Sequence, residues 1–65
     1  MPSIFQRRLR EIRRRKRITQ QWMADQLGIH RTTYTKYETE GVEPSLEMFY
    51  HISKLLNVDP KNLLE

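Results

Sequence analysis

The side chains best suited to specific hydrogen bonding lie close together, in the segment from Arg31 to Glu38. Four of them are polar or basic and share one face of a short predicted helix: Arg31, Thr32, Thr35 and Lys36. The opposite face holds Tyr34 and Tyr37, whose three-residue spacing is typical of a buried pair. A guanidinium can form paired hydrogen bonds, and threonine combines a hydroxyl with a methyl group. These groups suit recognition of a polar surface.

Other residue types that could support catalysis or metal binding lack the partners that such sites require. His30 and His51 have no companion cysteine, and no cluster of His, Asp or Glu has ligand spacing. We interpret Ser3 and Ser45 as helix caps and Ser53 as a small core residue, because no general base accompanies them. The two glycines are isolated, so no phosphate-cradling loop is predicted. We therefore expect no enzyme, no metal and no other cofactor.

The charges are divided unevenly along the chain. The formal net charge is +4, but residues 1–37 carry ten Lys or Arg and two acidic residues, a balance of +8. Residues 38–65 carry two Lys and six acidic residues, a balance of −4. A fold with one basic and one acidic half would present one face to a polyanion. This favours nucleic acid, although a basic amphipathic helix also suits an anionic membrane.

Length and composition favour one small domain in the cytoplasm. The 65 residues suffice for a single small core, so we expect one domain over residues 1–65. No apolar run approaches the roughly 20 residues of a membrane span, and the arginine-rich start lacks the apolar stretch of a secretory signal. The lack of cysteine fits a reducing compartment. No membrane association and no pocket for a small-molecule ligand are predicted.

Apolar spacing predicts an all-α fold of five helices. Their expected ranges are residues 3–15, 20–27, 31–38, 45–56 and 60–64. In the first helix, Phe5, Leu9 and Ile12 recur along one face. The fourth helix is expected to turn five side chains to the core: Leu46, Phe49, Ile52, Ser53 and Leu56. Suitable N-caps precede four of the helices: Ser3, Thr19, Ser45 and Asp59.

A tight turn joins the second and third predicted helices. Two helices that meet at a steep angle need a small residue at the crossing, here Ala24, and a residue that reverses the chain, here Gly28. Ile29 follows as an apolar plug. The third helix would then fit a major groove about 12 Å wide, with the second helix across the backbone. The segment QQWMADQLGIHRTTYTKYE is therefore a predicted helix-turn-helix.

At these residues the sequence resembles the Cro and lambdoid-repressor type of helix-turn-helix regulators, also called the xenobiotic-response-element (XRE) family. The similarity runs from about Arg8 to Leu64 through LREIRRRKRITQ, MADQLGI, TKYE and PSLEMFYHISKLLNVDPKNLL. The residues that match the family's pattern are Ile18, Thr19, Gln20, Ala24, Leu27, Gly28, Ile29, Glu38, Pro44, Ser45 and Leu46. The resemblance implies a five-helix, lambda-repressor-like DNA-binding domain.

The same resemblance implies roles for individual residues. Arg31, Thr32 and Lys36 would read bases, with Arg31 suited to guanine and Thr32 to a thymine methyl group. Gln20 would contact a phosphate and brace the start of the third helix. The other residues assigned to the DNA backbone are Thr19, Thr35, Thr39, Tyr34 and Arg13. Backbone contacts position a domain without reading sequence.

Three residues depart from the family's pattern. His30 stands where a Ser or Thr cap is common, which predicts a less firmly held start of the third helix. Tyr34 replaces a smaller Ile or Val, and we expect its hydroxyl to reach solvent or a phosphate. Trp22 occupies a usually polar position, and we expect it to cover the edge of the core rather than to anchor a partner. The eight basic residues before Ile18 also exceed what the family needs.

These observations lead to one principal hypothesis and two alternatives. We expect a sequence-specific double-stranded DNA-binding transcriptional regulator, a repressor that reads a pseudo-palindromic operator as a homodimer. The first alternative is RNA binding by the stretch RRLREIRRRKR, although Phe5, Leu9 and Ile12 tie that helix to the core. The second is an antitoxin-like module, in which the acidic half or Trp22 grips a partner protein.

Overall fold

The computed structural model describes residues 3–65, and this part of the chain contains four α-helices and one short 3₁₀ helix. The elements are α1 (Ile4–Arg15), α2 (Gln20–Leu27), α3 (Arg31–Thr39), α4 (Leu46–Leu55) and η1 (Pro60–Leu63). The all-α prediction is confirmed, and each expected boundary lies within one residue of the observed one. The fifth predicted helix is a 3₁₀ turn of four residues. None of the helices over residues 3–65 is long and apolar enough to cross a membrane.

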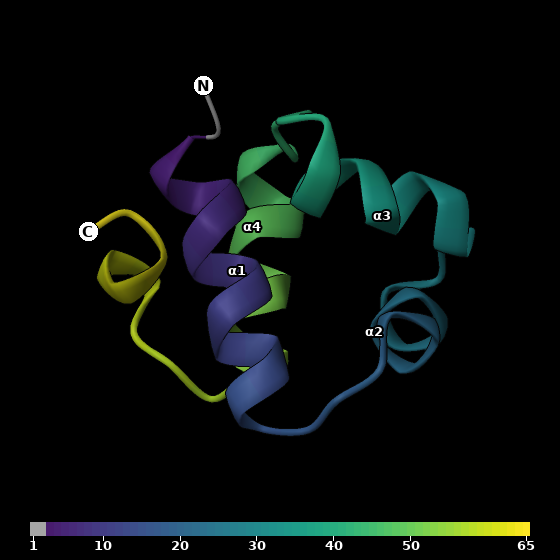
Figure 1. Ribbon diagram of the computed structural model, residues 1–65, viewed down its shortest axis with the longest axis horizontal. Helices are drawn as coiled ribbons and strands as arrows, with labels where there is room; N and C mark the ends of the chain where they lie inside the picture. Colours follow the sequence, from purple (N-terminus) through teal and green to yellow (C-terminus); the bar gives the residue numbers. More distant parts are fainter. Residues whose placement is uncertain (1–2) are drawn as a thin grey trace.

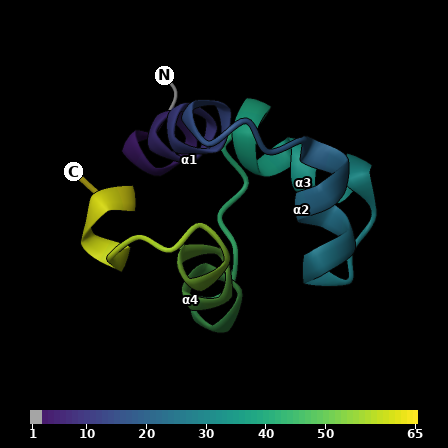
Figure 2. The ribbon, with the colours of Figure 1, turned by 90° about the horizontal axis from the view of Figure 1, so that it is seen from below.

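The helices enclose one cluster of buried apolar side chains. Phe5, Leu9 and Ile12 fix α1 to this core, as their spacing predicts, and the Phe5 ring lies 5.7 Å from that of Phe49 in α4. The other members are Met23, Ala24, Leu27, Tyr34, Tyr37, Ile52, Leu56 and Leu63. Figures 1 and 2 show α1 and α4 on two sides of the core, with η1 at one end and α2 and α3 at the other. The helix-turn-helix therefore forms one end of the molecule.

Side-chain caps begin every helix of residues 3–65 except α3. The four predicted caps each accept a hydrogen bond of 3.0–3.1 Å from a backbone N–H two or three residues later: Ser3, Thr19, Ser45 and Asp59. His30 precedes α3 and makes no such bond, as its departure from the family's pattern predicts. The backbone N–H groups in the first turn of α3 therefore lack a side-chain acceptor from the N-cap residue.

Three helices end with the same backbone hydrogen bonds. In each, a residue with positive φ is followed by an apolar residue whose N–H donates to a carbonyl five residues earlier, at 3.0–3.1 Å. The positive-φ residues are Arg17, Gly28 and Asn57, and the apolar residues are Ile18, Ile29 and Val58. All three apolar side chains pack against the core. This Schellman arrangement sets the direction in which the chain leaves each helix.

Leu46, which was expected in the core, lies on the surface instead, and Trp22, which was expected to cover the edge of the core, is partly exposed. Leu46 is 69% exposed because it is the first residue of α4 and precedes the residues that pack against the core, which begin at Met48. Trp22 is 41% exposed. It stands about 100° around α2 from Met23, whereas the buried residues of this helix lie on the other side of Met23.

The turn at Gly28 generates a stability prediction. Gly28 has a φ of 69°, and a β-carbon there would meet no atom within 4 Å, so only backbone strain opposes a side chain. We expect Gly28→Ala to lower the free energy of unfolding by roughly 1–2 kcal/mol. Gly28→Asn should lose less, because asparagine tolerates this conformation. Thermal unfolding of the three proteins tests the order, and equal losses for Ala and Asn would contradict it.

Candidate nucleic-acid interface

The helix-turn-helix consists of α2, the Gly28 turn and α3. Ala24 is fully buried in α2, a helix that packs against both α3 and α4. Tyr34 and Tyr37 are buried with their rings edge to face, 6.1 Å apart, which anchors α3 to the core. The outer face of α3 presents the four predicted polar residues, three exposed and Thr35 half-buried: Arg31, Thr32, Thr35 and Lys36. We call these four residues the recognition surface.

A buried ion pair holds α3 against α1. Arg13 of α1 donates from Nε to Oε2 of Glu38 at 2.7 Å and from Nη2 to Oε1 at 3.0 Å. Its Nη1 donates to the carbonyl oxygen of Ile18 at 2.7 Å. Arg13 is 8% exposed and Glu38 is 2% exposed. Because the pair is bidentate and buried, it fixes the angle of α3 as well as its distance from α1.

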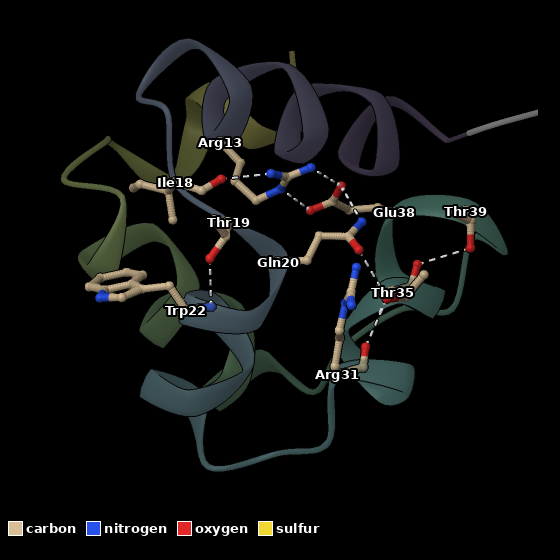
Figure 3. A network of polar contacts seen from close by, with 9 residues as sticks. All are labelled: Arg13, Ile18, Thr19, Gln20, Trp22, Arg31, Thr35, Glu38 and Thr39. Carbon is tan, nitrogen blue, oxygen red and sulfur yellow. Dashed lines mark hydrogen bonds and ion pairs between the residues drawn. The ribbon is translucent and has the colours of Figure 1, made fainter.

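Gln20, the first residue of α2, extends this network toward the recognition surface (Figure 3). Its Nε2 donates to Oε1 of Glu38 at 3.3 Å. The single hydroxyl hydrogen of Thr35 is shared between the carbonyl oxygen of Arg31, at 2.8 Å, and Oε1 of Gln20, at 3.3 Å. Gln20 thus braces the middle and end of α3, not its start as predicted. The network joins α1, α2 and α3 through side chains.

The two charges shift each other's protonation equilibria. The hydrogen bond to Glu38 raises the pKa of Arg13 against the opposing effect of burial. Burial alone would raise the pKa of Glu38, but hydrogen bonds from Arg13 and Gln20 and the charge of Arg13 outweigh it, so the pKa lies below its ordinary value. The pair is therefore ionised at neutral pH.

Two residues predicted to contact the DNA backbone are committed to the interior instead. Arg13 is buried and directs its guanidinium to Glu38 and Ile18, because an unpaired buried carboxylate would be costly. Tyr34 is fully buried, so its hydroxyl does not reach solvent. Among residues 3–65 this hydroxyl makes no well-formed hydrogen bond, but it lies near Glu38, and burial together with that carboxylate raises its pKa. The guanidinium of Arg13 is engaged by Glu38 and Ile18, although this side chain borders a hollow on the surface, whereas Tyr34 has no exposed surface.

Two shallow hollows adjoin the recognition surface. One is lined by Arg13, Arg14, Thr19, Gln20, Gln21 and Arg31. The other is lined by Gln20, Arg31, Thr32, Thr35, Lys36 and Glu40. They share Gln20 and Arg31, which are the first residues of α2 and α3. The positive ends of two helix dipoles therefore meet at basic hollows, which favours an anionic ligand. No group of three or more acidic or His side chains in residues 3–65 could hold a metal ion.

Known proteins are similar to this chain in sequence and in fold. Residues 7–65 match the model of a family described as "Helix-turn-helix domain". The chain belongs to the helix-turn-helix domain family. The domain is similar to a solved structure, the restriction-modification controller protein C.AhdI from Aeromonas hydrophila, with a TM-score of 0.84 and 28% identity. That match covers 94% of this chain and 92% of the controller protein.

Two curated relatives come from Bacillus subtilis. The domain is 42% identical over 62 residues to the uncharacterized HTH-type transcriptional regulator YqaE, a match that covers 95% of this chain and 53% of YqaE. The identity to the SPbeta prophage-derived uncharacterized HTH-type transcriptional regulator YonR is also 42%, over 95% of this chain and 57% of YonR. The domain thus spans little more than half the length of these relatives. With the structural match, they confirm the resemblance to XRE-type regulators.

Sequence reasoning missed the partner of Arg13. Glu38 was identified only as the residue that ends the family's third helix, because the two residues are 25 positions apart and no spacing rule connects them. One signal was available: Glu38 lies four residues after Tyr34, so it shares the inward flank of α3 with that side chain. A carboxylate at such a position needs a buried cation or donor.

The ion pair generates a second stability prediction. Glu38→Gln leaves the Arg13 charge buried without its counter-ion, and we expect a loss of roughly 3–5 kcal/mol in the free energy of unfolding. Glu40→Gln is the matched control, since Glu40 is exposed and forms no ion pair within residues 3–65. It should change stability by about 0.5 kcal/mol or less. Denaturant titration measures both, and similar losses in the two variants would contradict the role of the pair.

The same variant should also alter the pH dependence of stability. The pKa of Glu38 is lowered in the folded state, so its contribution is complete above the unfolded value of about 4.3 and is lost as pH falls through the folded value. The stability difference between the native protein and Glu38→Gln should therefore narrow on acidification below about pH 4. A difference independent of pH would contradict this.

Proposed function

We propose that the domain binds double-stranded DNA with sequence specificity and represses transcription, with α3 in the major groove. The observation that carries the proposal is the network from the buried pair of Arg13 and Glu38 through Gln20 to the half-buried Thr35, which holds α3 with its polar and basic face outward. Membership of the helix-turn-helix family supports it. A helix whose position is already fixed loses little backbone freedom on binding, so only its exposed side chains must be ordered against the base edges.

The contacts within the domain separate the residues proposed to read bases from those proposed to contact the DNA backbone. Arg31, Thr32 and Lys36 are exposed and form no ion pairs within residues 3–65, so they are proposed to read bases. Thr19 accepts a hydrogen bond from the N–H of Trp22, which leaves its own hydroxyl hydrogen free for a phosphate. We propose it, together with Gln20, as the main backbone contact of α2.

Thr35 and Thr39 are weaker candidates for phosphate binding. Their hydroxyls donate to the carbonyl oxygens of Arg31 and Thr35, at 2.8 and 2.9 Å. Each hydroxyl must leave a helix carbonyl before it can donate to a phosphate, which reduces the net gain. Thr39, expected in a loop, is the last residue of α3, so any contact from it comes from the helix end.

Selection from a random duplex DNA library with the purified domain tests the proposal. Enrichment of a motif with two inverted half-sites about one helical turn apart would support a sequence-reading dimer. Retention without enrichment, fading as salt rises, would contradict sequence reading. The same protein should then be offered structured RNA, because α1 carries the arginines on which that alternative rests. A reporter gene placed behind the selected operator separates repression from activation.

Arg31 provides the specificity prediction. Arg31→Ala should relax base preference at one position in each half-site and cost roughly 1–3 kcal/mol in binding, because a paired guanidinium contact with guanine is lost. Arg15→Ala is the control, since it removes the same charge from α1, where Arg15 pairs with Glu11. Selection with both variants measures the effect. An unchanged preference for Arg31→Ala would refute its assignment as a base reader.

We also propose that a second copy of the domain covers an apolar surface at the end opposite the helix-turn-helix. A hollow there is lined mainly by Phe5, Pro44, Leu46, Phe49 and Leu64, and both Leu46 and Leu64 are exposed. One such module reads only a few base pairs, whereas a symmetric pair reads an inverted repeat. A contact distant from α3 leaves both recognition surfaces free.

Leu46→Gln tests this pairing. Loss of the exposed leucine should shift the domain toward the monomer and weaken binding to an inverted repeat far more than binding to a single half-site. Trp22→Gln is the matched control, because it removes an exposed apolar side chain from α2. Sedimentation at several protein concentrations gives the oligomeric state. A native protein that stays monomeric both free and on DNA would refute the proposed surface.

A further inference from the structure

The basic residues of α1 fall into three groups with different partners. Arg13 is buried against Glu38. Arg8 and Arg15 flank Glu11, at 3.3 and 3.2 Å, and Arg8 also donates from Nε to the carbonyl oxygen of Asn62 at 2.9 Å. The flank that contains Arg8, Glu11 and Arg15 is thus directed toward η1 and has part of its charge neutralised.

The third group consists of Arg7, Arg10 and Arg14, which we call the arginine stripe. All three are exposed, and within residues 3–65 none of them forms an ion pair. Their spacing of three and four residues aligns them on one narrow band of the helix. The band is about 10 Å long at the helical rise of 1.5 Å per residue. Three full positive charges are therefore held in a line by a helix that is anchored in the core.

The position of the stripe follows from what α1 touches. Two residues mark its contact with the α3 side of the molecule: Arg13 against Glu38, and Gln6, whose Oε1 lies beside Gly41 in the loop after α3. Arg10 lies four residues after Gln6 and three before Arg13, on the same flank. The core residues of α1 lie on the inward side of Gln6 and Arg13. The arginine stripe therefore lies on the outward side of these two residues.

Arg14 connects the stripe to the recognition surface. It lines the same hollow as Thr19, Gln20 and Arg31, so the outer flank of α1 and the exposed start of α3 border one depression. A ligand that lies along α2 and α3 meets Arg14 first, then Arg10 and Arg7 further along α1. Glu40 is the acidic residue among the linings of the two hollows, and it lines the second hollow, not the one that Arg14 lines.

We infer that the arginine stripe is a second phosphate-binding surface, which follows the sugar–phosphate backbone of the duplex beyond the segment that α3 reads. The inference rests on the proposed function, because it takes the duplex as the ligand. Exposed guanidinium groups without counter-ions in the protein can bind phosphate oxygens in pairs and release condensed cations from DNA. The stripe adds affinity and registers the domain on the duplex, but it reads no bases.

Two double variants that remove the same charge from the same helix test the inference. One carries Arg10→Ala and Arg14→Ala, and the other carries Arg8→Ala and Arg15→Ala. Affinity for the selected operator is measured from low to near-physiological salt. Each lost phosphate contact on B-DNA should reduce the slope of log K against log salt by about 0.9, so the first variant should lose roughly 1.8 per domain. The second should keep the native slope, and both should keep the native base preference.

The outcomes separate the inference from the proposed function. If the native domain enriches no motif, the proposed function is contradicted, and so is the inference that the arginine stripe binds the duplex. If it enriches a motif but the two variants shift the slope equally, the effect is one of total charge and the stripe is refuted. Unchanged slopes in both, or a loss confined to RNA binding, also refute it. Circular dichroism establishes that each variant folds.

Duplex length gives a second, independent measurement on the native protein. Trimming the flanking base pairs that lie beyond the selected motif removes the phosphates that all three arginines of the stripe contact, so the native salt slope should fall by roughly 2.7 per domain. The Arg10→Ala, Arg14→Ala variant retains only Arg7 of the stripe, so trimming should lower its slope by no more than about 0.9. A native slope that does not change with duplex length would overturn the inference.

Discussion

The bidentate contact between Arg13 and Glu38 is the constraint on which the interface depends. It joins the first helix to the last turn of α3 across 25 residues of sequence, with both charges removed from water. Such a pair tolerates little deviation, because its attraction must offset the loss of hydration of two ions. Gln20 forms hydrogen bonds with both Glu38 and Thr35, and so connects the ion pair to the outer face of α3. The outward face of α3 is therefore set by an interaction on its inward flank.

The sequence predicted the elements well because their determinants are local. Caps, apolar spacing and Gly28 act within a few residues, and the helix boundaries that they imply match the structure. The outward residues of the recognition surface followed from the same periodicity. Arg13 was assigned to a phosphate because a partner 25 residues away is a property of the tertiary fold. Leu46 was misjudged for a related reason, since apolar character does not show where the core ends.

Tyr34 fills a core position beside the ion pair. Its ring packs edge to face with Tyr37, so a side chain larger than the usual Ile or Val is accommodated. Its hydroxyl makes no well-formed hydrogen bond within residues 3–65, but it lies close enough to Glu38 that the two groups shift each other's pKa. Tyr34 therefore contributes to the packing and the polar surroundings of the interior instead of to the outer face of α3.

The shared ending of α1, α2 and α4 bears on how the domain reaches its fold. Each of these turns closes through hydrogen bonds that span at most five residues, so it forms with little loss of chain entropy. Small helical domains built from such local contacts fold in microseconds to milliseconds. The docking of α1 onto α3 closes a much longer loop and orders charged groups in the interior. The local turns therefore cost less chain entropy to form than the contact between Arg13 and Glu38, which closes a loop of 25 residues.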